Sequence, residues 1–183
     1  ADYRPGSEAQ RLEGVPQGEV SQHSWNECKV FPGTTRNYWV YVPSQYDGKK
    51  PANLMVFQDG GGFVRDKGHT RAPIVFDNLI HKGDMPVTVG LFVNPGSIPG
   101  SEPSSQPRRN RAFEYDTVSD DYAKFIIDEL LPGVVKEHNL KLTKDQSGRA
   151  ICGNSSGGIA AFTAAWHRPE FFGVVISHIG SFT

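Results

Sequence analysis

Cysteine and methionine are both scarce in this chain of 183 residues, which has two of each. Two cysteines are too few for a disulfide scaffold, and Cys152 lies in an apolar run that favours a buried free thiol. Long apolar runs are missing too, because no stretch approaches the roughly 18 consecutive apolar residues of a membrane-spanning helix. The formal net charge is only −1, so the electrostatic footprint of a nucleic-acid-binding protein is absent. We therefore expect neither a membrane nor a nucleic acid as a partner.

The residues that are present have the composition of a globular domain. Hydrophobic residues make up 37% of the chain, and its 20 glycines and 13 prolines indicate many tight turns. The length is typical of one domain. The first residues, from Ala1, carry neither the basic nor the apolar region of a signal peptide, so either a signal peptide has been removed or the sequence has been trimmed. The compartment stays open, with a periplasmic or secreted location slightly favoured over a cytoplasmic one.

The order of the apolar patterns predicts the fold class. Residues 1–19 are polar and rich in Gly and Pro, and we expect a loosely ordered lead-in there. The aromatic and β-branched runs Glu19–Trp25 and Asn37–Val42 then predict a hairpin or a meander. Strands are next expected at Asn53–Gln58, Val87–Val93, Gly148–Cys152 and Phe171–Ser177, alternating with helices at 71–82, 118–137 and 156–166. This alternation predicts an α/β fold whose mostly parallel central sheet has helices on both faces. Pro132 is expected to kink or interrupt the longest helix. The Pro- and Ser-rich segment 94–112 is expected to be a functional or mobile loop.

The most informative segment is Gly153-Asn154-Ser155-Ser156-Gly157, a Gly-x-Ser-x-Gly pattern between a predicted strand and a predicted helix. That setting is typical of a nucleophile elbow, in which the serine occupies a strained position on a sharp turn. The residues two before and two after the serine must be very small, a condition that Ser155 meets and Ser156 does not. The following helix directs its positive N-terminal end at the place where an oxyanion would form. A glycine-rich turn that binds a phosphate is the alternative interpretation.

A second glycine motif, Gly60-Gly61-Gly62, follows the strand predicted at Asn53–Gln58. In hydrolases of this architecture the loop after that strand supplies one oxyanion-hole N–H, and the residue after the serine supplies the other. Gly61 and Ser156 are therefore the expected donors. A phosphate-binding loop is excluded because no Gly-Lys-Ser/Thr follows the glycines. In isolation, such a run of glycines would indicate only a flexible turn.

Four segments together carry a resemblance to a known family: Asp59–Gly62, Arg111–Asp116, Glu129-Leu130-Leu131-Pro132 and Gly153–Gly158. Through these segments the sequence resembles the putative-esterase family of α/β-hydrolases. That family includes enterochelin, feruloyl and acetyl-xylan esterases, S-formylglutathione hydrolases and mycolyltransferases, and the Arg-x-x-Glu motif before the long helix favours the enterochelin-esterase-like branch. The resemblance covers residues 25–183 and implies a serine esterase of α/β-hydrolase fold.

One departure from the family pattern concerns the rest of the catalytic triad. In α/β-hydrolases the acid and then the histidine follow the serine in the chain. Only 28 residues follow Ser155, and they contain no Asp, one Glu (Glu170) and two histidines, His167 and His178. None of these is assigned to a triad. The resemblance therefore implies that the acid and the histidine lie beyond residue 183, and that residues 20–183 are the N-terminal portion of one domain, truncated after its sixth strand.

The expected partner is a small-molecule ester, and the candidate substrate-binding residues are Arg111, Glu114 and Asn154. With Arg108 and Arg109, Arg111 could form a cationic rim for an acidic or catecholate substrate; alternatively these charges are merely solvated, with Arg111 paired to a nearby carboxylate, Glu114 or Asp116. No cofactor is expected, and no metal, because the sequence has no His-Glu-x-x-His or Cys-x-x-Cys motif. The oligomeric state stays open.

Two alternative functions remain open at this stage. An acyltransferase of the same family would form the same acyl-enzyme and pass the acyl group to an alcohol. A non-catalytic binding module would have kept the fold and lost the triad. The intact glycines around Ser155 argue against the binding module, because a module that no longer catalyses has no physical reason to keep a strained turn.

Overall fold

The computed structural model describes residues 4–100, 105–180 and 182. Residues 1–3 of the expected lead-in and residues 101–104 of the expected loop lie outside the described part. The main sheet has six strands in the order β1-β2-β4-β3-β7-β8. The strands are β1 (Glu19–Trp25), β2 (Arg36–Val42), β3 (Asn53–Gln58), β4 (Thr88–Val93), β7 (Arg149–Asn154) and β8 (Val174–His178). All six match strands expected from the sequence to within a few residues.

The sheet combines antiparallel and parallel strand pairs. β1 and β2 form the predicted antiparallel hairpin, and β2 runs antiparallel to β4. The other neighbours, β4 with β3, β3 with β7 and β7 with β8, are parallel. Every residue of β4 is buried, as are five of the six in β3, which is the burial expected of parallel strands covered on both faces.

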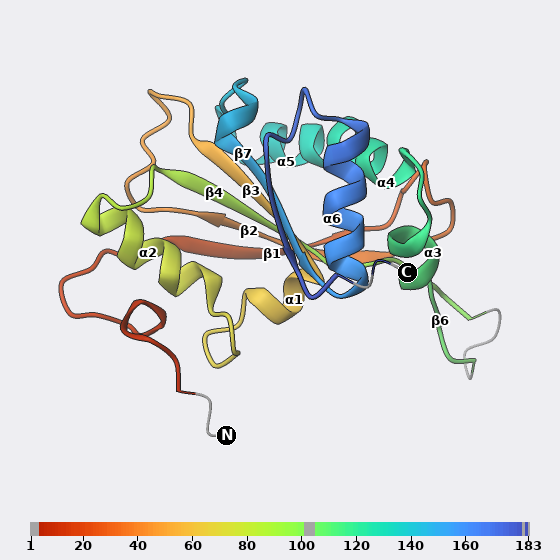
Figure 1. Cartoon of the computed structure of the whole chain (residues 1–183), viewed down its shortest axis with the longest axis horizontal. Helices are drawn as coiled ribbons and strands as arrows, with labels where there is room; N and C mark the ends of the chain where they lie inside the picture. The colour runs from red at the N-terminus through yellow and green to blue at the C-terminus, as the bar shows by residue number, and fades with distance from the viewer. Residues whose placement is uncertain (1–3, 101–104, 181, 183) are drawn as a thin grey trace.

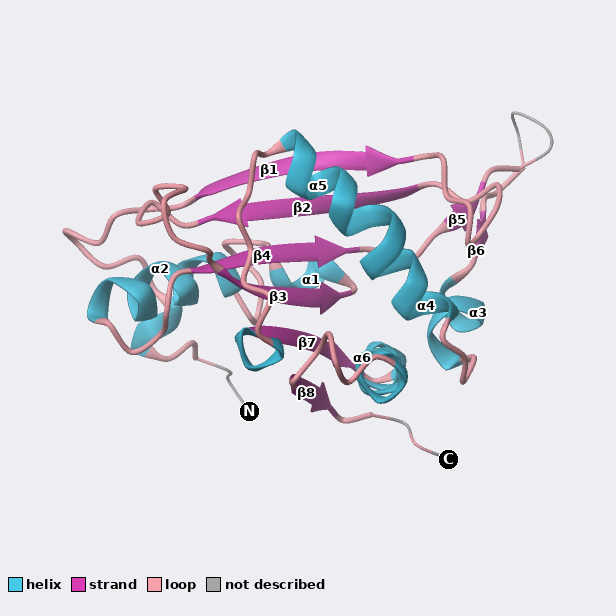
Figure 2. Cartoon of the chain, turned by 90° about the horizontal axis from the view of Figure 1, so that it is seen from above, coloured by secondary structure: helices cyan, strands magenta, loops and turns pink. Residues whose placement is uncertain are grey.

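Helices cover both faces of this sheet (Figures 1 and 2). The helical elements are η1 (Ser7–Ala9), α1 (Gly60–Phe63), α2 (Ala72–Lys82), α3 (Arg111–Asp116), α4 (Asp121–Lys124), η2 (Phe125–Leu130), α5 (Leu131–Glu137), η3 (Gln146–Gly148) and α6 (Ser156–His167). One apolar core packs the sheet against the α4–α5 segment and α6, and the other packs it against α1 and α2. The predicted α/β architecture, with helices on both faces of a mostly parallel sheet, is confirmed.

The longest predicted helix, 118–137, is continuous in direction but not in hydrogen bonding. It begins at Asp121 and passes through the six-residue π-helical segment η2 before α5. Pro132 lies in the first turn of α5 and has no N–H with which to continue the hydrogen bonding of η2 into α5. The interruption expected at Pro132 is therefore a change of helix type just before the proline.

The segment after β4 is more ordered than the predicted loop. Its ends pair as the short strands β5 (Ser97–Ile98) and β6 (Arg108–Arg109), and helix α3 follows directly. Both cysteines of the chain are buried free thiols, as expected for Cys152. In the described part of the chain, no helix combines the length and the apolar character needed to cross a membrane.

Candidate active site

Ser155 occupies the turn between β7 and α6, with a backbone φ of 55° and ψ of −125°. A non-glycine residue adopts positive φ only where the surrounding structure enforces it. Here the enforcing contact is between two glycines: a Cβ placed on Gly153 would lie 2.1 Å from the carbonyl oxygen of Gly157. The strand and the helix therefore approach so closely that only glycine fits at Gly153, and Ser155 is left at the tip of the turn, half-buried.

The first turn of α6 also packs against the end of β3. A Cβ on Gly157 would lie 3.0 Å from Asp59 Oδ2 and 3.2 Å from Gln58 Cβ. The serine turn and the glycine loop after β3 consequently lie side by side at one end of the sheet (Figure 1). The N–H of Ser156 belongs to the first turn of α6, where the helix itself offers no acceptor.

The glycine loop forms a short helix rather than an extended turn. Asp59 adopts a left-handed conformation, with φ of 55° and ψ of 41°, and precedes α1. A Cβ on Gly60 would lie 2.3 Å from the backbone of Phe92, so α1 packs directly on β4. The N–H of Gly61 donates to Asn94 Oδ1 at 2.9 Å. The Gly61 N–H, which was expected to be an oxyanion donor, is thus already hydrogen-bonded to the side-chain oxygen of Asn94.

Arg111 pairs with Asp59, a partner that the sequence did not suggest. Its Nε and Nη2 atoms donate to the two carboxylate oxygens of Asp59 at 2.9 and 2.7 Å. The hydrogen bond to Asp59 raises the pKa of Arg111. Tyr115 holds the backbone of the same residue, because its hydroxyl oxygen accepts the Asp59 N–H at 3.1 Å. Arg111 therefore pairs with Asp59 rather than with Glu114 or Asp116, and its two hydrogen bonds hold the start of the glycine loop.

Glu114 does not face the site, and its assignment to substrate binding is corrected. Its side chain is fully buried against that of Arg36, with Arg36 Nη1 and Glu114 Oε2 2.6 Å apart. The same carboxylate accepts hydrogen bonds from the Gly96 N–H and from Asn110 Nδ2. A Cβ on Gly96 would lie 2.5 Å from Glu114 Oε1, so glycine is needed for this approach. The carboxylate of Glu114 is thus engaged by structural partners and closed to a ligand.

Asn154 lies directly before Ser155 and is half-buried. Its Oδ1 atom is buried and has no hydrogen-bond partner among the described residues. Its β8 neighbour is His178, whose carbonyl oxygen accepts the Ser155 N–H at 3.0 Å. A role of Asn154 in substrate binding stays a prediction, with an unused acceptor atom as its structural support.

Arg108 and Arg109 lie apart from the Asp59–Arg111 pair, exposed on β6. They line a cavity of about 610 Å³ with ten lining residues, which include the aromatic side chains Phe31 and Phe113. A cationic, partly aromatic cavity is therefore present, but Arg111 is not part of it. The three arginines expected to form one rim are thus separated: Arg108 and Arg109 line this cavity, whereas Arg111 pairs with Asp59.

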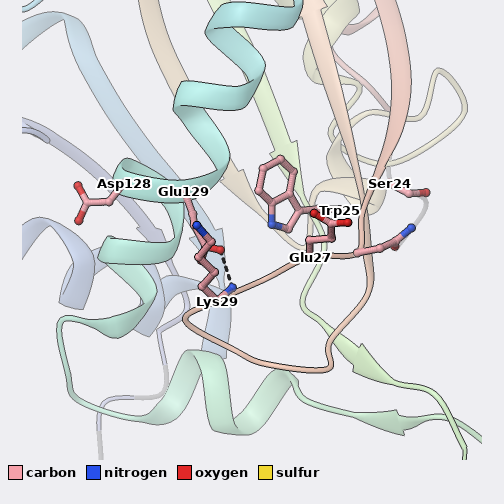
Figure 3. Close-up of a pocket in the computed structure, with 7 residues that line it drawn as sticks. Ser24, Trp25, Glu27, Lys29, Asp128 and Glu129 are labelled. Carbon is pink, nitrogen blue, oxygen red and sulfur yellow. Dashed lines mark hydrogen bonds between the residues drawn. The ribbon is translucent and has the colours of Figure 1, made fainter.

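Another cavity, of about 540 Å³, lies at the end of β1 (Figure 3). Glu129 contributes to its wall, and its carboxylate accepts the N–H groups of Lys29 and Val30 at 2.5 and 3.1 Å. None of the site residues expected from the sequence lines it.

In the described part of the chain, the residues placed to hold a metal ion are His23, Glu137 and His138, on β1 and at the end of α5, outside the turn that carries Ser155.

The chain is similar in sequence or in fold to several known esterases. The chain is 26% identical over 150 residues to the iron(III) salmochelin esterase of Escherichia coli O6:H1, covering 82% of this chain and 33% of the relative. Its fold matches the ferric enterobactin esterase of Salmonella typhimurium with a TM-score of 0.75 at 22% identity, covering 100% of this chain and 40% of that one.

A third similar protein is a ferulic acid esterase of the anaerobic fungus Anaeromyces mucronatus, with a TM-score of 0.67 at 18% identity, covering 94% of this chain and 62% of the other. The chain thus spans about a third of the curated relative and well under half of the enterobactin esterase. The family model described as putative esterase matches residues 31–182. From the strained serine turn, the adjoining glycine loop and this match, the chain belongs to the putative-esterase family of α/β-hydrolases.

Proposed function

We propose that the protein hydrolyses carboxylic esters through an acyl-enzyme on Ser155. The observation that carries the proposal is the position of Ser155, held at positive φ at the N-terminus of α6 and beside the glycine loop. Ser155 Oγ attacks the ester carbonyl, the alcohol leaves with a proton, and water then releases the acid and restores the serine. The N–H of Ser156, at the helix N-terminus, stabilises the oxyanion in both steps.

The second oxyanion donor in this proposal is the N–H of Gly61. Because that N–H now donates to Asn94 Oδ1 at 2.9 Å, substrate binding must exchange one oxygen acceptor for another. The exchange is feasible because the competing acceptor is a side chain rather than the backbone. Each such donor is typically worth about 10²–10³ in rate.

The base that activates Ser155, and its acid partner, belong in this proposal to sequence beyond Thr183. The related esterases are longer, and this chain covers 62% of the ferulic acid esterase. In α/β-hydrolases the acid and histidine follow the serine in the chain. The activity proposed here is accordingly that of the intact protein.

For the substrate we propose an ester that carries an aromatic group. Relatives of this chain are named for salmochelin, enterobactin and ferulic acid. The cavity lined by Arg108, Arg109 and Phe113 offers cationic and aromatic side chains that fit such a group. Adding a second alcohol during turnover separates hydrolysis from acyl transfer, because a transferase would convert that alcohol into an ester.

The test is a comparison of adjacent serines in the intact protein. Ser155→Ala removes the nucleophile and is expected to lower kcat by at least about 10³-fold. Ser156→Ala is the matched control, because the proposed contribution of Ser156 is its backbone N–H, which alanine keeps. Retention of kcat by Ser155→Ala would overturn the proposal, as would equal losses in both variants.

A further inference from the structure

A cluster of two histidines and one glutamate joins β1 to the end of α5. Glu137 is the last residue of α5 and His138 follows it, while His23 lies within β1. In Figure 2 the end of α5 lies beside β1. The two parts of the cluster are more than one hundred residues apart in the chain, so a search for metal-binding motifs in the sequence could not find it.

The three side chains are close enough to share one ion. His23 Nδ1 and Glu137 Oε1 are 3.2 Å apart. The rings of His23 and His138 meet edge to face, with centroids 4.9 Å apart. One potential ligand atom from each residue lies within 4.8 Å of the others. Metal–ligand bonds of about 2.0–2.2 Å to each atom are therefore reached with small side-chain movements.

Neighbouring side chains already orient these ligands. His23 Nε2 and Ser21 Oγ are 2.8 Å apart, which leaves Nδ1 facing the carboxylate. The Tyr38 hydroxyl donates to the other oxygen of Glu137 at 3.4 Å, and the Tyr38 ring stacks on His23 with centroids 5.1 Å apart. Metal-binding histidines and carboxylates commonly have such a second hydrogen bond, which fixes the ring and the lone pair.

An unused nitrogen is the independent sign of a ligand. His138 Nε2 is buried and has no hydrogen-bond partner among the described residues, although buried polar atoms nearly always have one. The ring also follows the C-terminus of α5, where the helix carbonyls favour a positive charge. A cation would satisfy the nitrogen, the carboxylate and the helix end together.

We propose that His23, Glu137 and His138 bind one divalent transition-metal ion, with Zn²⁺ as the favoured metal and water in the fourth position. Two imidazole nitrogens and one carboxylate suit Zn²⁺, whereas Mg²⁺ and Ca²⁺ require mostly oxygen ligands. The ion would connect the edge strand β1 to α5 and stabilise the fold, because it binds the folded chain more tightly than the unfolded one.

The test is a Zn²⁺ titration of the intact, tag-free, chelator-treated protein by calorimetry, combined with thermal melting. We expect one ion per chain and a higher Tm with Zn²⁺. Glu137→Gln keeps the shape of a half-exposed side chain and is expected to weaken binding more than about 100-fold. Ser21→Ala, which alters only a supporting contact, is expected to weaken it about 10-fold.

The matched control is His81→Ala, which removes an exposed histidine from α2 and is expected to bind Zn²⁺ like the unchanged protein. Far-UV circular dichroism establishes that each variant is folded. The proposal is overturned if the unchanged protein binds Zn²⁺ no more tightly than Glu137→Gln does, or if His81→Ala loses the ion. Because no readout depends on ester hydrolysis, a failure here is separate from a failure of the proposed esterase activity.

Discussion

Helix α3 contributes one residue to each of two arginine–carboxylate pairs, and the two pairs lie in very different surroundings. Glu114 pairs with Arg36 of β2, and both side chains are 0% exposed. Arg111 pairs with Asp59 of the glycine loop, and these side chains are 35% and 32% exposed. Both carboxylates are held at two points by their arginines. The two contacts are alike in geometry, so the main difference between them is access to water.

That difference separates a structural pair from a positioning pair. Removing one partner of a buried pair leaves an uncompensated charge inside the protein, which costs about 3–5 kcal/mol. A half-exposed pair is worth only about 0–1 kcal/mol in stability, since water and salt compensate for its loss. What the Arg111–Asp59 contact can supply is position, because Asp59 directly precedes the proposed oxyanion loop.

The largest effect is expected from breaking the buried pair. Glu114→Gln leaves the Arg36 charge without a counter-charge and should lower the free energy of unfolding by about 3–5 kcal/mol. Denaturant unfolding measures the change. The control is Glu170→Gln, at an exposed position, where a change within about 0.5 kcal/mol is expected. Similar losses at both positions would show that burial is not what matters.

The next effect is on turnover rather than stability. Arg111→Ala frees the Asp59 carboxylate and should lower kcat/KM by about 10–100-fold, because a small misplacement of a catalytic group has that cost. Its free energy of unfolding should fall by less than about 1 kcal/mol. Arg65→Ala, at an exposed position beyond α1, should change neither quantity. Loss of stability without loss of turnover would reverse the roles given to the two pairs.

A smaller effect is expected from crowding the same carboxylate. Gly157→Ala places a Cβ 3.0 Å from Asp59 Oδ2, so the carboxylate must shift by a few tenths of an ångström. We expect kcat/KM to fall by less than about 10-fold, well below the loss for complete misplacement. Gly62→Ala is the matched control, because a Cβ there has no neighbour within 4 Å. Equal effects at the two glycines would contradict the positioning role of Asp59.

The fold was predictable because its strands are marked by local patterns. The apolar run Asn53–Gln58 predicted β3 residue for residue, and the Gly-x-Ser-x-Gly pattern located the turn at Ser155. Short helices were not predictable, since α1 and α3 have too few residues to show helical periodicity.

Charge pairing was the part of the site that sequence reasoning missed. Nearby carboxylates were the natural partners for Arg111, whereas the structure brings Asp59 from 52 residues away. Glu114 was expected among the substrate-binding residues, but its side chain is fully buried. Its burial depends on Arg36, 78 residues earlier in the chain, and on the close approach of Gly96. Only the folded chain brings these groups together.

The central claim is that Ser155 is the nucleophile of an esterase, and fluorophosphonate labelling of the intact protein tests it most directly. Mass spectrometry of the digested protein should find the label on Ser155, and the Ser155→Ala variant should take up none. Labelling of a different residue with Ser155 unmodified, together with loss of ester hydrolysis, would contradict the account.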